Sequence, residues 1–138
     1  MDEIQVVAFT LGEELYAIPI GNVKEIINAT KITSIPKAEC QVKGIINLRG
    51  KIITVLNLAS KLGLISTNEK LSDRKVIIVE NKDTIVGFEV DTVSEVLKIP
   101  TDKIEPPPLM AQQANFMTGI GKIDGRLILL LNVDTLVL

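Results

Sequence analysis

Short apolar runs separated by turn signals dominate this sequence, and they restrict the chain to folds built from β-hairpins. The apolar runs are four to seven residues long, and Gly, Asn, Asp or Lys residues stand between them. Runs of this length are typical of strands, and two such runs joined by a short turn predict a hairpin. We expect four hairpins, over residues 6–20, 45–58, 76–90 and 120–131.

The hairpins recur at regular offsets, which indicates two copies of one unit. Residues 6–27 align with residues 76–97 at an offset of 70, and residues 42–58 align with residues 117–133 at an offset of 75. Each copy contains a hairpin, a short helical turn, a strand and a second hairpin. A unit with about five short strands has the size of an SH3-like barrel. We therefore predict an all-β fold with short helical turns, in which two SH3-like five-stranded β-barrels are packed together.

A polar stretch suggests the boundary between the two copies. Residues 66–74 read as a linker, so we predict a first barrel over residues 1–65 and a second barrel over residues 75–138. The apolar run at residues 127–131 does not alternate with polar residues, which indicates that both faces of this strand are covered. We expect the contact between the barrels to take this run.

Residue totals exclude several kinds of chemistry. The chain has no His and a single cysteine, Cys40. These counts exclude Ser-His-Asp and Cys-His catalysis, His-ligated or Cys-only zinc, and a phospho-histidine relay on this chain. We also find no phosphate-binding loop motif. We expect a protein that is not an enzyme and uses no metal or cofactor, with Cys40 an incidental thiol.

Charge and hydropathy bear on partners and location. A formal net charge of −2 and a pI near 5.2 argue against nucleic acid and against attraction to an acidic membrane face. The apolar runs are far shorter than the roughly 20 residues of a membrane helix. The acidic start, Met1-Asp2-Glu3, does not match a signal peptide. We expect a cytoplasmic protein without direct membrane insertion.

Several motifs in order resemble the CheW family along nearly the whole chain. The most specific is VKGIINLRGKII at residues 42–53, and further matches lie at residues 9–20, 23–27, 86–91, 105–108 and 119–128. The resemblance implies an adaptor of chemotaxis signalling that couples chemoreceptor tips to the histidine kinase CheA by binding both. The implied partners are the cytoplasmic tips of methyl-accepting chemoreceptors and the CheW-like regulatory domain of CheA. The implied location is the cytoplasm, beside membrane-associated receptor arrays.

The resemblance also implies which residues bind the receptor. Arg49 matches a family arginine that is associated with receptor binding and that pairs with the glutamate matching Glu25. We expect these two side chains to form an ion pair, although an arginine at a hairpin tip could simply be solvated. The other receptor-binding candidates are Val23, Gly44, Asn47, Leu48 and Val96.

Three of these candidates have a plain structural alternative. Val23 and Val96 would serve equally well in core packing, and Gly44 could open a strand at a bulge. In the receptor-binding interpretation, these three residues border an apolar groove that accepts a receptor helix. A missing side chain at Gly44 would let that helix approach closely.

A proline-rich segment provides the candidates for kinase binding, which are Glu105, Pro106, Leu109 and Met110. Residues 105–110 form a stiff polyproline stretch with two apolar side chains. The alternative is a rigid linker with no partner.

Three other functions stay open at this point. The chain could be a CheW-like domain detached from a kinase or from a receiver-fused adaptor. A nucleic-acid-binding barrel pair is opposed by the acidic pI and by an aromatic content of 3%. An enzyme is opposed by the lack of a catalytic constellation in the sequence.

Overall fold

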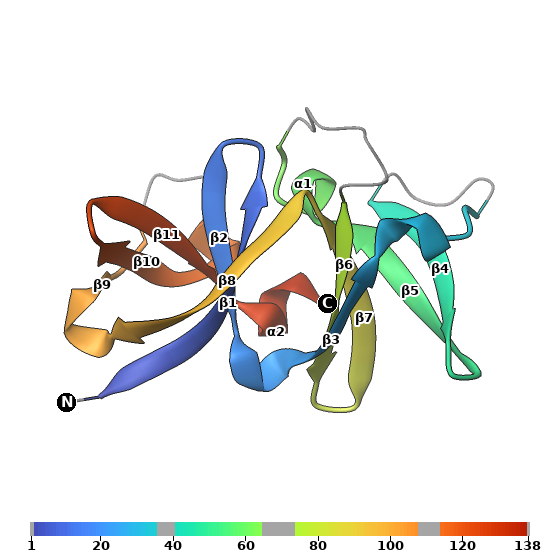
Figure 1. Ribbon diagram of the computed structural model, residues 1–138, viewed down its shortest axis with the longest axis horizontal. Coiled ribbons are helices and arrows are strands. Elements are labelled where there is room, and N and C mark those ends of the chain that lie inside the picture. The colour runs from blue at the N-terminus through green and yellow to red at the C-terminus, as the bar shows by residue number, and fades with distance from the viewer. Residues whose placement is uncertain (1, 36–40, 65–73, 108–113, 138) are drawn as a thin grey trace.

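The computed structural model describes residues 2–35, 41–64, 74–107 and 114–137, and strands dominate it (Figure 1). Cys40, Leu109 and Met110 lie outside the described residues, as does the predicted linker except for Arg74. None of the helices in the described ranges is long and apolar enough to cross a membrane. The predicted all-β fold with short helical turns is confirmed.

The elements follow one another in the order of the two repeats. The strands are β1 (Glu3–Leu11), β2 (Glu14–Pro19), β3 (Val23–Asn28), β4 (Val42–Leu48), β5 (Lys51–Asn57), β6 (Lys75–Asn81), β7 (Thr84–Val90), β8 (Thr92–Pro100), β9 (Ile104–Glu105), β10 (Met117–Ile123) and β11 (Arg126–Leu131). The α-helices are α1 (Leu58–Lys61) and α2 (Val133–Leu136). The 3-10 turns are η1 (Ile20–Asn22), η2 (Ala29–Lys31), η3 (Thr101–Lys103) and η4 (Ala114–Phe116).

The strands form two sheets that close in the same way. One has the order β8-β1-β2-β11-β10-β9, and its end strands β8 and β9 are joined through η3, so the sheet folds back on itself. The other has the order β3-β6-β7-β5-β4. Here β3 leads through η2 to Thr33, which bridges to Ile45 of β4. We term them the six-stranded barrel and the five-stranded barrel.

Each barrel takes strands from both halves of the chain. The six-stranded barrel combines β1 and β2 with β8 to β11, and the five-stranded barrel combines β3 to β5 with β6 and β7. In Figure 1 the blue β1 and β2 lie with the red β10 and β11, far from the teal β4. The predicted division into barrels of residues 1–65 and 75–138 is therefore wrong, because the two repeats exchange their first hairpins.

The four hairpins close with two-residue turns. Arg49 and Gly50 join β4 to β5 with φ values of +53° and +86°, and Asp124 and Gly125 join β10 to β11 with φ values of +51° and +77°. Positive φ at both central residues is the type I′ geometry, which suits the twist of paired strands. The same turn therefore stands at matched positions of the two repeats.

Three clusters of buried side chains fill the molecule. One lies within the five-stranded barrel and a second within the six-stranded barrel. The largest combines residues of both sheets, such as Phe9 and Phe88, with residues of both α-helices. Because successive strand residues point to opposite faces, β6 places Ile77 in this shared core and Ile78 in the core of its own barrel.

The apolar run at residues 127–131 divides between these cores. Ile128 and Leu130 lie in the core of the six-stranded barrel, whereas Leu129 and Leu131 pack in the shared core. Leu127 is 57% exposed. The prediction that the run lies between the barrels therefore holds only for alternate residues.

A buried charge cluster ties the two barrels together. The Arg74 side chain is only 3% exposed and donates from Nη1 to Oδ1 of Asp91 at 2.8 Å and from Nη2 to Oε1 of Glu89 at 3.2 Å. Oδ2 of Asp91 accepts the backbone N–H of Gly12, in the turn between β1 and β2, at 2.7 Å. Arg74 is thus part of the packed interior, and its assignment to the polar linker was wrong.

Candidate functional site

The predicted ion pair between Arg49 and Glu25 is present in the structure. Nη1 of Arg49 lies 2.6 Å from Oε2 of Glu25, which projects from β3. The Arg49 side chain is 75% exposed and that of Glu25 is 26% exposed. Glu25 therefore orients the guanidinium group of Arg49. The other N–H groups of this guanidinium stay accessible to a partner.

Asn47 supports the turn that presents Arg49. Oδ1 of Asn47 accepts the backbone N–H of Gly50 at 2.9 Å. Arg49 has a positive φ, which is uncommon for a residue with a side chain. The Asn47 hydrogen bond helps to hold this backbone, so one predicted receptor-binding residue positions another.

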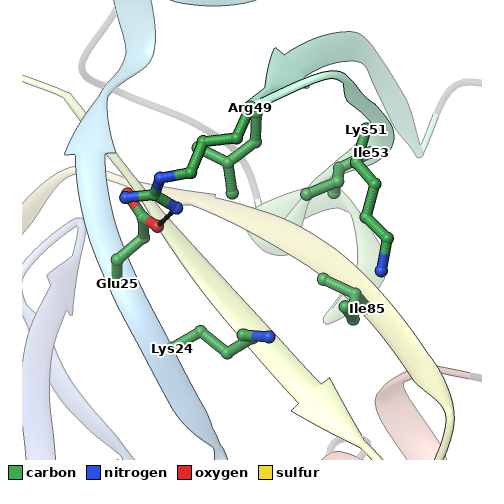
Figure 2. Close-up of a pocket in the computed structure, with 7 residues that line it drawn as sticks. Lys24, Glu25, Arg49, Lys51, Ile53 and Ile85 are labelled. Atoms are coloured by element: carbon green, nitrogen blue, oxygen red, sulfur yellow. Dashed lines mark hydrogen bonds and ion pairs between the residues drawn. The ribbon is translucent and has the colours of Figure 1, made fainter.

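A pocket opens beside the ion pair on the five-stranded barrel (Figure 2). Leu48, Ile53 and Ile85 form its apolar lining. Its charged lining consists of Lys24, Glu25, Arg49 and Lys51. Figure 2 shows Lys24 beside Glu25 on one side of the pocket and Lys51 beside Ile53 and Ile85 on the other.

The two lysines, Ile53 and Ile85 were not among the predicted site residues. Lys24 stands between the predicted residues Val23 and Glu25, and Lys51 stands two positions after Arg49, so their charge near these residues was an available signal. Ile85 belongs to β7, which reaches this place only because the repeats exchange hairpins. Nothing in the sequence pattern placed Ile85 beside Arg49.

Gly44 is buried where the five-stranded barrel closes. A Cβ atom on Gly44 would lie 2.2 Å from the carbonyl oxygen of Thr33, and one on Gly119 would lie 2.9 Å from the carbonyl oxygen of Glu105. The strand register shifts next to both glycines. Glycine therefore permits the closing segment to approach at matched bulges, and the close approach at Gly44 comes from the chain itself rather than from an open groove.

Val23 and Val96 lie in different environments. Val23 is half-buried on β3 and packs against the shared core. Val96 is 54% exposed on β8 of the six-stranded barrel. Core packing thus explains Val23 but not Val96. The apolar groove bordered by these three residues stays a prediction.

The described part of the kinase-binding segment is polar. Glu105 ends β9, and its Oε2 lies 2.5 Å from Nζ of Lys122. Pro106 follows and is exposed. Glu105 and Lys122 also line a shallow pocket with Asp102 and Lys103. The apolar residues that motivated the prediction, Leu109 and Met110, lie outside the described residues.

The fold and the site describe a small all-β protein of two closed barrels with a shared core, which exposes charged and apolar side chains around the Arg49 turn. The CheW-like domain family matches residues 5–138, and the chain belongs to this family. Chemotaxis protein CheW of Thermotoga maritima is 35% identical over 99% of this chain and 89% of that protein. Chemotaxis protein CheW of Helicobacter pylori is 34% identical over 95% of this chain and 79% of that protein.

A solved structure agrees with the fold. The crystal structure of the scaffolding protein TtCheW from Thermoanaerobacter tengcongensis superposes with a TM-score of 0.90 at 37% sequence identity. The match covers 99% of this chain and 88% of that chain. The similarity therefore extends over both barrels.

Proposed function

We propose that this chain is a chemotaxis adaptor that couples chemoreceptor tips to the histidine kinase CheA by binding both at once. The observation that carries the proposal is the Arg49–Glu25 ion pair, which presents an accessible guanidinium at the position that the CheW resemblance implies for receptor binding. Membership of the CheW-like family supports the adaptor role. The adaptor acts in the cytoplasm beside membrane-associated receptor arrays, through surfaces rather than catalytic groups.

The receptor-binding surface is centred on the turn that carries Arg49. Leu48 lines the pocket beside the ion pair, and Asn47 holds the turn. Val96 provides exposed apolar area on the other barrel, whereas Val23 and Gly44 contribute through the shape of the barrel. A helical receptor tip presents the polar and apolar side chains that such a surface binds.

The kinase-binding surface lies on the six-stranded barrel. Glu105 and Pro106 are exposed at the end of β9, and the chain continues from there to Leu109 and Met110. The partner is the CheW-like regulatory domain of CheA. Because the Arg49 turn and the segment that begins at Glu105 lie on different barrels, both partners can bind one molecule, and each then biases the geometry available to the other.

The decisive experiment is co-sedimentation of the purified chain with a receptor cytoplasmic fragment and the CheA regulatory domain of the same organism. We expect a ternary complex. Arg49→Ala should release the receptor fragment and keep the kinase domain. Asp124→Ala, at the matched turn of the other barrel, is the control and should retain both partners. Failure of the unmodified chain to bind either partner would contradict the proposal.

A further inference from the structure

The internal repeat allows the pocket beside Arg49 to be compared with its counterpart in the six-stranded barrel. The offsets of 70 and 75 assign a counterpart to every residue that lines the pocket. The apolar character is retained, because Ile85, Leu48 and Ile53 correspond to Leu15, Ile123 and Ile128. The two places therefore share a backbone framework and an apolar lining.

The charges at the two places differ. Lys24, Arg49 and Lys51 correspond to Ser94, Asp124 and Arg126, and glutamate stands at both matched positions, 25 and 95. The pocket thus carries three cations and one carboxylate, a formal charge of +2. The counterpart carries one cation and two carboxylates, a formal charge of −1. The same framework therefore presents a positive surface on one barrel and a negative surface on the other.

Ion pairing increases this contrast. Glu95 is paired with Arg126, at 3.4 Å, so the cation that corresponds to Lys51 is already engaged. In the five-stranded barrel Arg49 pairs with the glutamate instead. Lys51 then has no ion-pair partner anywhere in the part of the chain that the structure describes. The pocket consequently retains a cation that is available to a ligand.

Lys24 is the second cation of the pocket. Its Nζ lies 3.7 Å from Oε1 of Glu80, and both side chains are about half exposed. Such an exposed, long contact is weak and is easily replaced by a better acceptor. Both lysines line the pocket, and a carboxylate accepts charge-assisted hydrogen bonds from ammonium groups that are stronger than neutral ones.

We propose that this pocket binds an aspartate or glutamate side chain of the chemoreceptor tip, held by Lys24 and Lys51, and that the charge difference directs the receptor to this barrel rather than to its counterpart. The inference rests on the proposed function, because it names the chemistry of the receptor segment that docks beside Arg49. On a helix, side chains three or four positions apart share a face. An acidic residue with an apolar neighbour one turn away therefore matches the charged and apolar linings of the pocket.

The test compares Lys51→Glu with Arg126→Glu, a matched pair that makes the same charge change at repeat-equivalent positions. Calorimetric titration with the receptor cytoplasmic fragment is run at low and high salt. The unmodified chain should bind more weakly as salt rises, because screening weakens exposed charge contacts. Lys51→Glu should lose about tenfold in affinity and much of the salt dependence, whereas Arg126→Glu should stay within about twofold.

Charge exchange identifies the receptor residue. Each acidic residue of the receptor tip is changed in turn to lysine, and one such change should restore binding to Lys51→Glu. If the unmodified chain does not bind the fragment, the proposed function fails. If it binds and the two variants weaken binding equally, or if no charge exchange restores it, the pocket inference is overturned while the proposed function stands.

Discussion

Arg74→Met should destabilise the protein far more than Arg49→Met, although both arginines pair with carboxylates. Arg74 is 3% exposed and contacts Asp91 at 2.8 Å and Glu89 at 3.2 Å. Arg49 is 75% exposed and pairs with Glu25. Methionine retains an unbranched apolar stem but removes the charge, so Arg74→Met leaves two carboxylates in the interior.

The size of the effect follows from burial. Removing one partner of a buried ion pair destabilises a protein by about 3–5 kcal/mol, because the remaining charge is uncompensated. Lys43 offsets part of this loss, since its Nζ lies 3.8 Å from Oε1 of Glu89 and its side chain is 34% exposed. We therefore expect the lower end of that range, about 3 kcal/mol, for Arg74→Met. The exposed pair of Arg49 contributes under about 1 kcal/mol.

Urea unfolding, monitored by circular dichroism, measures both variants under the same conditions. The midpoint should fall substantially for Arg74→Met and barely change for Arg49→Met, with similar slopes. The double variant Arg74→Met/Glu89→Leu should lose less than the sum of the single changes, because the second change removes a stranded carboxylate. Equal midpoints for the two arginine variants would refute the argument from burial.

Three further outcomes are expected. Arg49→Ala should weaken receptor binding in a pull-down and leave the melting temperature nearly unchanged; a large drop would show that Arg49 is structural. Gly44→Ala should destabilise by about 1–3 kcal/mol because the added Cβ meets backbone, whereas Gly21→Ala meets nothing within 4 Å; equal urea midpoints would contradict the closure role. Burial, and secondarily Glu14, raise the pKa of Tyr16. The unfolded chain then loses this proton first, so stability should fall as the pH rises above about 10, and Tyr16→Phe should remove that fall. An ordinary pKa in a tyrosinate absorbance titration would exclude this linkage.

The sequence predicted features that depend on neighbours in the chain. The repeat offsets match each strand of the first copy to a strand of the second. Asn57 and Asn132, a matched pair, both cap short helices by accepting the backbone N–H groups of Ser60 and Asp134. The Arg49 ion pair came from the family resemblance instead, because strand patterns say nothing about residues 24 positions apart.

The exchange of hairpins could not be predicted from the sequence pattern, and the reason is physical. The predicted first hairpins of the two repeats, residues 6–20 and 76–90, have the same length and similar apolar runs. The sequence pattern therefore allows either hairpin to complete either sheet. The choice depends on contacts made across the molecule, such as the parallel pairing of β5 with β7, in which Val55 lies opposite Gly87. The burial of Arg74 was missed because residues 66–74 were read together as a polar linker. Arg74 stands with Glu89 and Asp91 at the open end of the β6–β7 hairpin, where the turn at Gly12 of the other barrel contacts Asp91.

The exchanged hairpins also bear on how an adaptor of this kind would couple its partners. Strand β7 carries Ile85 of the pocket lining near its start and Glu89 of the buried charge cluster near its end. Asp91, two residues further on, holds the Gly12 turn of the six-stranded barrel. The pocket and the other barrel are therefore connected through one strand, a buried ion cluster and a shared core. A packed connection of this kind passes a change in orientation from one barrel to the other, whereas two domains on a flexible linker would absorb it.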